Sequence, residues 1–193
     1  MRNVIFFINM SLDGFIAGPN GEMDWIASDD DIWDDFIALQ NTADAALFGR
    51  VNYQGAEGYW QSGAVQQATS KGEVEHAHWL AQATRIVFSR TLDKVAWPDT
   101  RIIKDHIAEA IAKLKQQSGK NMILFGGADI AATFTQQGLI DEYRIYVNPV
   151  VLGGGKPLFK ANQDKLNLKL LETKPFKSGV VALRYGAPAD NSR

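Results

Sequence analysis

Short hydrophobic runs alternate with amphipathic segments along most of the chain, and this alternation predicts the fold. The runs are rich in β-branched and aromatic side chains, as buried strands are, and they comprise residues 4–9, 45–48, 85–88, 101–104 and 121–125. Between them, apolar side chains recur with the period of one helix face, in residues 28–39, 65–83, 106–117 and 128–137. Strands that alternate with helices predict a largely parallel α/β sheet.

The pattern changes in the last third of the chain. Residues 143–151 alternate apolar and polar positions and lead into a turn of three glycines at 153–155. Residues 166–172 and 180–185 then flank a polar segment at 173–179. This arrangement predicts a closing antiparallel hairpin on an otherwise parallel sheet.

Composition narrows the classes of function. The 193 residues, 46% of them hydrophobic, suit one domain over residues 1–186, followed by a polar tail at 187–193. The net charge of -2 offers no basic face for nucleic acid or a membrane surface. Without cysteine, and with His76 and His78 diverging on a predicted helix, we expect no metal site. No apolar run approaches the ~20 residues needed to cross a bilayer, and no leader is recognisable, so we expect a cytoplasmic protein.

Three predicted strands end in turns that suit a nucleotide. Gly49-Arg50, Ser89-Arg90 and Gly126-Gly127 each follow a strand, and the carboxyl ends of parallel strands share one edge of a sheet. Two arginines and a hydroxyl suit a phosphate monoester, while the helix start after the third turn suits a pyrophosphate. Together the turns favour NADPH over NADH as the ligand. The alternative is that the glycines only allow close helix packing and that the arginines are solvated.

An acidic group opens the first predicted helix. Ser28 is a candidate N-cap, and the carboxylates at 29–31 suit the positive end of a helix. The group, which extends to Asp35, has the residue types of a metal site, but a helix start with a solvated face is the interpretation we favour. Asp31 has the spacing to point inward. A carboxylate in apolar surroundings has a raised pKa and can deliver a proton, so Asp31 is the candidate catalytic residue.

The loop before this helix has the features of a ligand cover. Two turn sequences, residues 11–14 and 18–21, bracket the apolar segment 15–17. Aromatic side chains at positions 25, 33, 53, 59 and 60 either form a stacking wall for a flat heterocycle or belong to ordinary packing. The candidate substrate-binding residues are Asp13, Phe15, Trp25 and Tyr53.

These segments resemble a known family in their order and spacing. The segments are SLDGFIA at 11–17, LFGR at 47–50, residues 123–130 with their paired glycines, and NPVVLGGG at 148–155. They resemble the C-terminal reductase domain of the bifunctional riboflavin-biosynthesis protein and the stand-alone dihydrofolate-reductase-like members of that superfamily. The resemblance covers nearly the whole chain. It implies a three-layer dihydrofolate-reductase-like fold, NADPH binding and commonly a homodimer.

The resemblance also implies roles for individual residues. Ile16 and Ala17 would lie beside the nicotinamide, and Ser89 and Arg90 would meet the 2′-phosphate. Asp31 is the closest match to a carboxylate that dihydrofolate reductases place near the start of their first helix. The residues implied at the adenosine phosphates and the pyrophosphate are Gly49, Arg50, Val51 and Asn52, which start a helix, and Gly126, Gly127, Ala128, Asp129 and Ile130.

Two positions depart from the riboflavin reductases. Phe15 stands in place of a lysine and Phe125 in place of a glutamate, so two polar groups that would address a ribityl phosphate or a pyrimidine are absent. The expected activity is that of an NADPH-dependent reductase, which transfers a hydride to a C=N or C=O group of a small pterin- or pyrimidine-like heterocycle. The alternative is a non-catalytic module that senses or sequesters NADPH.

Overall fold

The hydrophobic runs become the strands of one eight-stranded sheet. The computed structural model, which describes residues 1–61, 70–159 and 165–187, has the strand order β5-β4-β3-β6-β1-β7-β10-β9. The first six strands in this order are parallel, and β10 lies antiparallel between β7 and β9. The expected mostly parallel sheet with antiparallel C-terminal strands is confirmed. The strands are β1 (Val4–Ser11), β3 (Ala43–Gly49), β4 (Thr84–Phe88), β5 (Thr100–Ile103), β6 (Asn121–Phe125), β7 (Glu142–Asn148), β9 (Lys169–Pro175) and β10 (Val181–Gly186).

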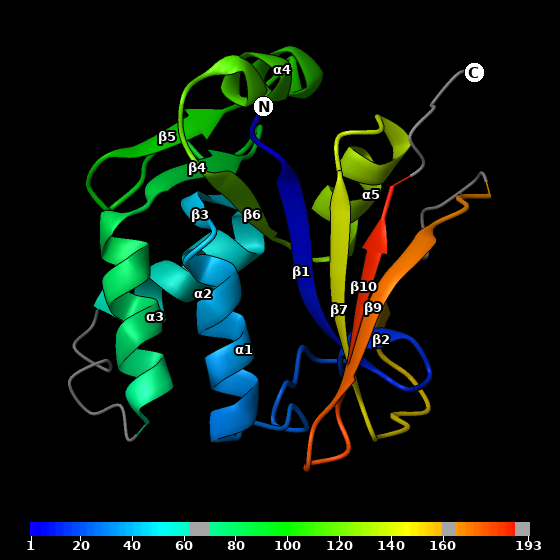
Figure 1. Ribbon diagram of the computed structural model, residues 1–193. Coiled ribbons are helices and arrows are strands. Elements are labelled where there is room, and N and C mark those ends of the chain that lie inside the picture. Colours follow the sequence, from blue (N-terminus) through cyan, green and yellow to red (C-terminus); the bar gives the residue numbers. More distant parts are fainter. Residues whose placement is uncertain (62–69, 160–164, 188–193) are drawn as a thin grey trace.

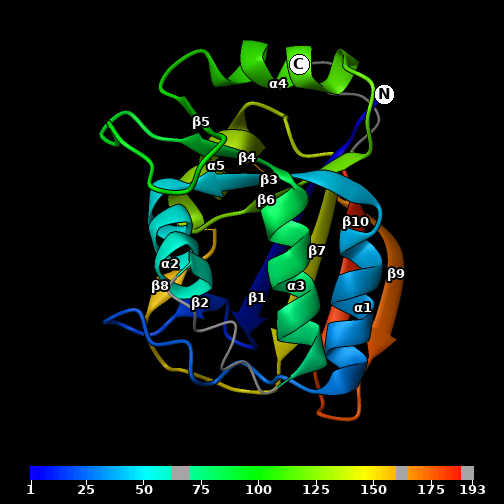
Figure 2. The same cartoon turned by 90° about the vertical axis from the view of Figure 1, so that its left-hand side faces the viewer.

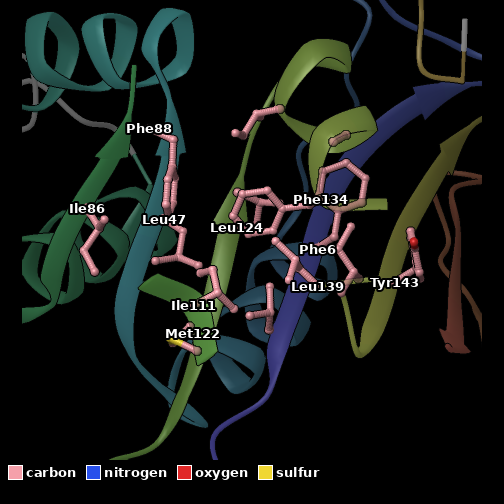
Figure 3. Close-up of a cluster of buried hydrophobic side chains, with 14 of the residues drawn as sticks. Phe6, Leu47, Ile86, Phe88, Ile111, Met122, Leu124, Phe134, Leu139 and Tyr143 are labelled. Atoms are coloured by element: carbon pink, nitrogen blue, oxygen red, sulfur yellow. The ribbon is translucent and has the colours of Figure 1, made fainter. Parts of the chain in front are cut away.

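Helices cover both faces of the parallel part of the sheet (Figures 1 and 2). Helices α1, α2 and α3 lie on one face, where Phe36, Tyr53 and Leu80 pack on the strands. Helices α4 and α5 lie on the other face, where Ile111 and Phe134 pack on the strands (Figure 3). The three-layer architecture is therefore confirmed. The helices are α1 (Asp30–Gln40), α2 (Arg50–Gln61), α3 (Lys71–Gln82), α4 (Ile107–Gln116) and α5 (Ala128–Gln136).

Side chains on both faces of the central strands are buried. Phe6 and Leu124 point toward α4 and α5, whereas Ile5 and Ile123 point toward α1. Most residues on both faces are buried, which is why these strands are largely apolar. Burying one such side chain contributes about 1.5–3 kcal/mol, so the most hydrophobic runs occupy the centre of the sheet.

Helix α2 is the longest element that the hydrophobic pattern did not predict. Its sequence contains Gly55 and Gly58, each of which lowers helix propensity by about 1 kcal/mol relative to alanine. The helix forms because Tyr53 and Ala56 face the sheet and pack in one cluster with Phe48. Only the family resemblance implied a helix that starts here.

Several boundaries also differ from those predicted. The hairpin strand β9 begins at Lys169 rather than at residue 166, because its pairing with β10 sets its limits. Asp29 rather than Ser28 caps α1: its extended backbone directs the carboxylate to the Ile32 N–H at 2.9 Å. The Ser28 hydroxyl instead accepts from the Trp33 indole at 2.9 Å.

The predicted cover loop contains a strand. Residues Phe15–Ala17 form β2, which pairs with β8 (Lys156–Pro157) in a separate two-stranded sheet. Helix α3 begins only at Lys71, after the cap Ser70. Residues 65–69 of the predicted second helix, and 188–193 of the predicted tail, lie outside the described residues.

Candidate functional site

The carboxyl ends of β4, β3 and β6 are neighbours in the sheet, as the parallel pattern requires. Helix α2 follows β3 directly, and α5 follows β6 after the Gly126-Gly127 turn. A Cβ atom on Gly49 would come within 2.9 Å of Ile130 Cγ2, and one on Gly126 would overlap the same methyl group. The first turn of α5 therefore lies over the ends of both strands. Glycine at these two positions makes that approach possible.

The first turns of α2 and α5 also lie close together. A Cβ atom built on Gly127 would have Asn52 Oδ1 as its nearest neighbour, at 3.8 Å. Gly127 is the N-cap of α5 and makes no side-chain cap hydrogen bond, so the first N–H groups of this helix are not used by a cap. Arg50 opens α2 and is exposed, donating to Gln54 at 3.1 Å. Two positive helix ends and a cation meet at one point.

More cations follow β4 and β5. Arg90 has an 84% exposed side chain and lies 3.5 Å from Asp105. Lys104, which follows β5, donates to Asp93 at 2.7 Å. The Ser89 hydroxyl accepts two backbone N–H bonds of its own turn, at 3.2 and 3.0 Å, and its proton remains available for donation. Lys104 was not among the predicted site residues, because the sequence pattern placed it inside the run 101–104, whereas β5 ends at Ile103.

The predicted cofactor-binding residues divide into exposed and buried positions. Val51 and Asn52 on α2 and Asp129 on α5 are exposed, and Ala128 is partly exposed. Ile130 is buried and packs against the glycines described above. The remaining two, Ile16 and Ala17 of β2, are buried as well, and Ile16 belongs to the same hydrophobic cluster as Ile130.

Asp13 fastens the loop that carries β2. Its carboxylate accepts the Ser11 hydroxyl at 2.7 Å and the N–H groups of Leu152 and Gly153 at 3.1 and 2.8 Å. The Ser11 hydroxyl, followed by these N–H groups, lowers the pKa of Asp13 below its usual value. Gly155 packs so tightly on the Ala17 carbonyl that a Cβ atom would overlap it. The three-glycine turn therefore lies against β2, and Asp13 holds the two together.

The other predicted substrate residues do not form one wall. Tyr53 is fully buried and donates to Glu57 at 2.6 Å, so the expectation that it contacts a substrate is wrong. The packing of α2 on the sheet turns it inward. Phe15 is partly exposed in β2, opposite Pro157. Trp25 is partly exposed, with its indole N–H on the Glu22 carbonyl at 3.1 Å.

The predicted catalytic carboxylate does not point inward. Asp31 is 49% exposed and lies 3.4 Å from Lys177 in the β9–β10 turn. Asp35, one helical turn later, is the α1 carboxylate that meets the sheet. It accepts the Tyr146 hydroxyl and the Lys174 ammonium, and its side chain is 14% exposed. Burial, followed by the bond to Asp35, raises the pKa of Tyr146.

The two histidines diverge as expected. His76 is buried and lies 2.5 Å from Gln40 Nε2, while His78 is exposed. Burial lowers the pKa of His76 to about 3. Within residues 1–61, 70–159 and 165–187, no group of three or more potential ligands could hold a metal ion. Across the same residues, none of the helices has the length and apolar character needed to span a membrane.

A groove of about 260 Å³ lies between β5 and α4, including the first turn of α4, and no described residue of α2 or α5 lines it. Its lining mixes cations and anions, among them Arg101, Lys113 and Glu109, so its charge selects no one ligand. Asp105 also lines it and connects it to the strand-end site through Arg90.

Known proteins resemble this chain in sequence or in fold. The uncharacterized protein YyaP of Bacillus subtilis (strain 168) is 38% identical over 184 residues, which are 95% of this chain and 94% of that protein. A putative riboflavin biosynthesis protein from Shewanella sp. PV-4 has a TM-score of 0.76 at 23% identity, over 97% of this chain and 99% of that one. The dihydrofolate reductase of Enterococcus faecalis, solved in complex with NADP(H), has a TM-score of 0.63 at 14% identity, over 97% of both chains.

The family model agrees with these similarities. The model described as the RibD C-terminal domain matches residues 2–182. This span includes β1 to β7, the glycine turn after β6 and the start of α5. The protein therefore belongs to the family of the RibD C-terminal domain.

Proposed function

We propose that this protein is an NADPH-dependent reductase that acts on a C=N or C=O group of a small pterin- or pyrimidine-like heterocycle. The observation that carries the proposal is the meeting of the α2 and α5 N-termini at adjacent strand ends. Arg50 is exposed at the start of α2, and Arg90 is exposed after β4, the strand next to β3. Membership of a reductase domain family and the dihydrofolate-reductase-like fold support it.

The residues at this edge fit the phosphates of the cofactor. The uncapped N–H groups at the start of α5 suit a pyrophosphate, and among the described residues only Asn52 Oδ1 comes within 4 Å of a Cβ atom built on Gly127. Arg50 would add charge from α2, and Ser89 and Arg90 would hold the 2′-phosphate. Under this proposal, Ser89 and Arg90 would supply the donors that distinguish NADPH from NADH.

The loop that Asp13 holds in place would position the nicotinamide against the substrate. Ile16 and Ala17 form an apolar wall that would exclude water beside the nicotinamide, and the bonds of Asp13 keep that wall in place. When bound, NADPH would supply a hydride, which carries the two electrons of the reduction, to the substrate carbon, while the substrate nitrogen or oxygen takes a proton from water. We assign no proton transfer to Asp31, because it lies on the surface beside Lys177.

Calorimetric titration with NADPH, and with NADH as the comparison, tests the cofactor site. We expect micromolar binding of NADPH and weaker binding of NADH. Arg50→Ala should weaken the binding of both NADPH and NADH. Arg90→Ala should weaken the binding of NADPH alone, by about tenfold, which corresponds to the loss of one charge-assisted hydrogen bond. Arg101→Ala, an exposed arginine within β5, is the matched control. Equal affinities in all three variants would contradict the proposal.

One observation favours the alternative of binding without turnover. Both α1 carboxylates that could deliver a proton are engaged elsewhere, Asp31 with Lys177 and Asp35 with Tyr146 and Lys174. If the protein binds NADPH but no pterin, pyrimidine or carbonyl compound causes NADPH oxidation, the protein is such a module. Oxidation of NADPH that depends on one of these compounds, and that Gly126→Val abolishes, would exclude it.

We also propose a homodimer that uses the β9 edge. Every residue of β9 is exposed, including Leu170 at 52% and Leu171 at 46%. A long exposed edge strand with apolar side chains is a template for pairing with another chain. Analytical ultracentrifugation should show a dimer that Leu171→Glu dissociates and that Met23→Glu, at another exposed site, leaves intact. A monomeric native protein would refute this.

A further inference from the structure

The connection between β4 and β5 carries two of the proposed cofactor donors. Residues 89–99 form neither helix nor strand, and they begin with Ser89 and Arg90 at the strand-end site. Figure 2 shows this 89–99 connection beside α2, the helix that Arg50 opens. A cofactor held by both segments requires a fixed spacing between them. The contacts that fix this spacing therefore bear on which cofactor is selected.

A carboxylate of α2 holds the far end of the 89–99 connection. Glu57 Oε1 accepts the Ala96 N–H at 2.7 Å and the Trp97 N–H at 3.0 Å. The same oxygen accepts the hydroxyl of the buried Tyr53, one helical turn earlier, at 2.6 Å. Burial alone would raise the pKa of Glu57, but the three hydrogen bonds together lower it, so the carboxylate is charged at neutral pH. Hydrogen bonds to a charged acceptor are stronger than neutral ones.

The ring of Trp97 gives the connection a second anchor. This ring is buried, packs in one cluster with Tyr53 and lies under the Arg85 guanidinium, whose Cζ is 4.8 Å from the ring centroid. Arg85 is buried as well and donates to three carbonyl groups at the end of α3, at 2.6 to 3.1 Å. It also donates to the Pro98 carbonyl at 2.8 Å. The far end of the connection is therefore fixed to the layer of α2 and α3.

The near end of the connection is held by β5 and the residues that follow it. The Ser89 N–H donates to the Ile103 carbonyl at 3.1 Å. Arg90 lies 3.5 Å from Asp105. These contacts place the two donors relative to β5 but not relative to α2. The hydrogen bonds of Glu57 supply that second relation, because they join the connection to the helix itself.

We propose that Glu57 is a positioning residue for cofactor selection, which holds the 89–99 connection against α2 so that Ser89 and Arg90 reach the 2′-phosphate of NADPH. A carboxylate would repel a phosphate at contact, so Glu57 acts through the backbone that it binds. Arg50 and the start of α5 do not depend on this connection, and NADH binding should therefore not need Glu57. The inference rests on the reductase function proposed above.

Calorimetric titrations of Glu57→Ala with NADPH and with NADH test this role. We expect NADPH affinity to fall about fivefold and NADH affinity to change by less than about twofold. The loss should be smaller than the loss in Arg90→Ala, because a misplaced donor costs no more than a missing one. Glu57→Gln retains an oxygen that accepts the two N–H bonds and should keep most of the preference for NADPH. An unchanged preference in Glu57→Ala, or equal losses for both cofactors, would overturn the proposal.

Asp44 provides a matched control at the amino end of β3, the opposite edge of the sheet. Its carboxylate accepts the Lys120 N–H at 2.8 Å and the Arg2 guanidinium, so it also holds a loop by a backbone hydrogen bond. Asp44→Ala and Glu57→Ala should both lower the urea midpoint of unfolding, because each leaves a backbone donor unpaired. Only Glu57→Ala should lower the preference for NADPH. The same loss of preference in Asp44→Ala would attribute it to general destabilisation and refute the role of Glu57.

A double-mutant cycle tests the route of the effect. In an Arg90→Ala background, Glu57→Ala should lower the preference for NADPH by less than about twofold, since the guanidinium that it positions is already absent. Additive losses of the two variants would show that Glu57 acts by another route, and would refute the proposal.

Hydrogen exchange without any cofactor separates this proposal from the reductase function. The amides of residues 89–99 should exchange faster in Glu57→Ala than in the wild type, and at the wild-type rate in Asp44→Ala. If the wild type binds no NADPH while exchange responds in this way, the reductase fails and the anchoring of the connection by Glu57 remains. If the wild type prefers NADPH and Glu57→Ala changes neither exchange nor preference, the positioning role fails and the reductase remains.

Discussion

The parallel centre of the sheet and its β9 edge differ in how far they are covered. Helices cover both faces of β1, β3 and β6, and their side chains form the core. All residues of β9 are exposed, although the strand is seven residues long and pairs with β10 along its length, with one register shift at Arg184/Tyr185. Regular secondary structure therefore occurs in both regions, but only the covered one carries most of the burial energy. The following changes test that difference.

The largest effect is expected where burial is complete. Phe134 of α5 is fully buried and meets Phe88 edge to face at 5.1 Å. Phe134→Ala should lower the free energy of unfolding by about 3–5 kcal/mol. In the monomer, Leu171→Ala in β9 should lower the free energy of unfolding by less than about 0.5 kcal/mol, as an exposed position does. Urea denaturation measures the unfolding free energy of both variants. Comparable losses would contradict the view that the covered centre of the sheet carries most of the burial energy.

The next effect concerns glycines rather than rings. Gly126→Ala brings a Cβ atom into the Ile130 side chain, so α5 must move. We expect a loss of about 1–3 kcal/mol in unfolding free energy, as for overpacking, together with weaker NADPH binding. Gly58→Ala in the exposed part of α2 meets no atom within 4 Å and should stabilise by about 0.5–1 kcal/mol. In an Ile130→Ala background, Gly126→Ala should lower the unfolding free energy by less, which would confirm that overlap with Ile130 causes the loss.

A pH-dependent effect compares a buried histidine with an exposed one on the same helix, α3. The pKa of buried His76 is lowered from 6.5 to about 3, so only the unfolded chain binds a proton between these values. The stability it contributes is complete above pH 6.5 and is lost as pH falls toward 3, by roughly 1.4 kcal/mol at about pH 5.5. His76→Gln should remove this dependence, and His78→Gln should retain it. Urea midpoints at several pH values decide between them.

The smallest effect on stability belongs to the exposed strand ends. Lys104 pairs with Asp93 on the surface, and Lys104→Ala should change unfolding free energy by less than about 0.5 kcal/mol. It should nevertheless weaken NADPH about threefold by removing charge near the phosphates. Lys113→Ala on α4 should change neither quantity. Unchanged NADPH affinity in Lys104→Ala would exclude this lysine from the proposed site.

The candidate site was predictable where it depends on chain neighbours. Gly126-Gly127, Gly49-Arg50 and Ser89-Arg90 follow their strands in sequence, so any parallel arrangement brings them to one edge. Asp31 and Tyr53 were misplaced because their orientation depends on distant partners. Asp31 lies on the surface beside Lys177 of the β9–β10 turn, and the packing of α2 buries Tyr53. Helical spacing alone does not identify which face a remote element will cover.

The sequence by itself determined the alternation of strands and helices, the central place of the most hydrophobic runs and the glycine turns at strand ends. These features follow from periodicity, burial energy and backbone freedom, which act between near neighbours. Only the tertiary structure decided that Asp35 meets the sheet, that Asp13 clamps the 152–155 turn and that Glu57 binds the backbone of the 89–99 connection. Each of these depends on contacts between segments far apart in the chain, and such contacts leave no local pattern.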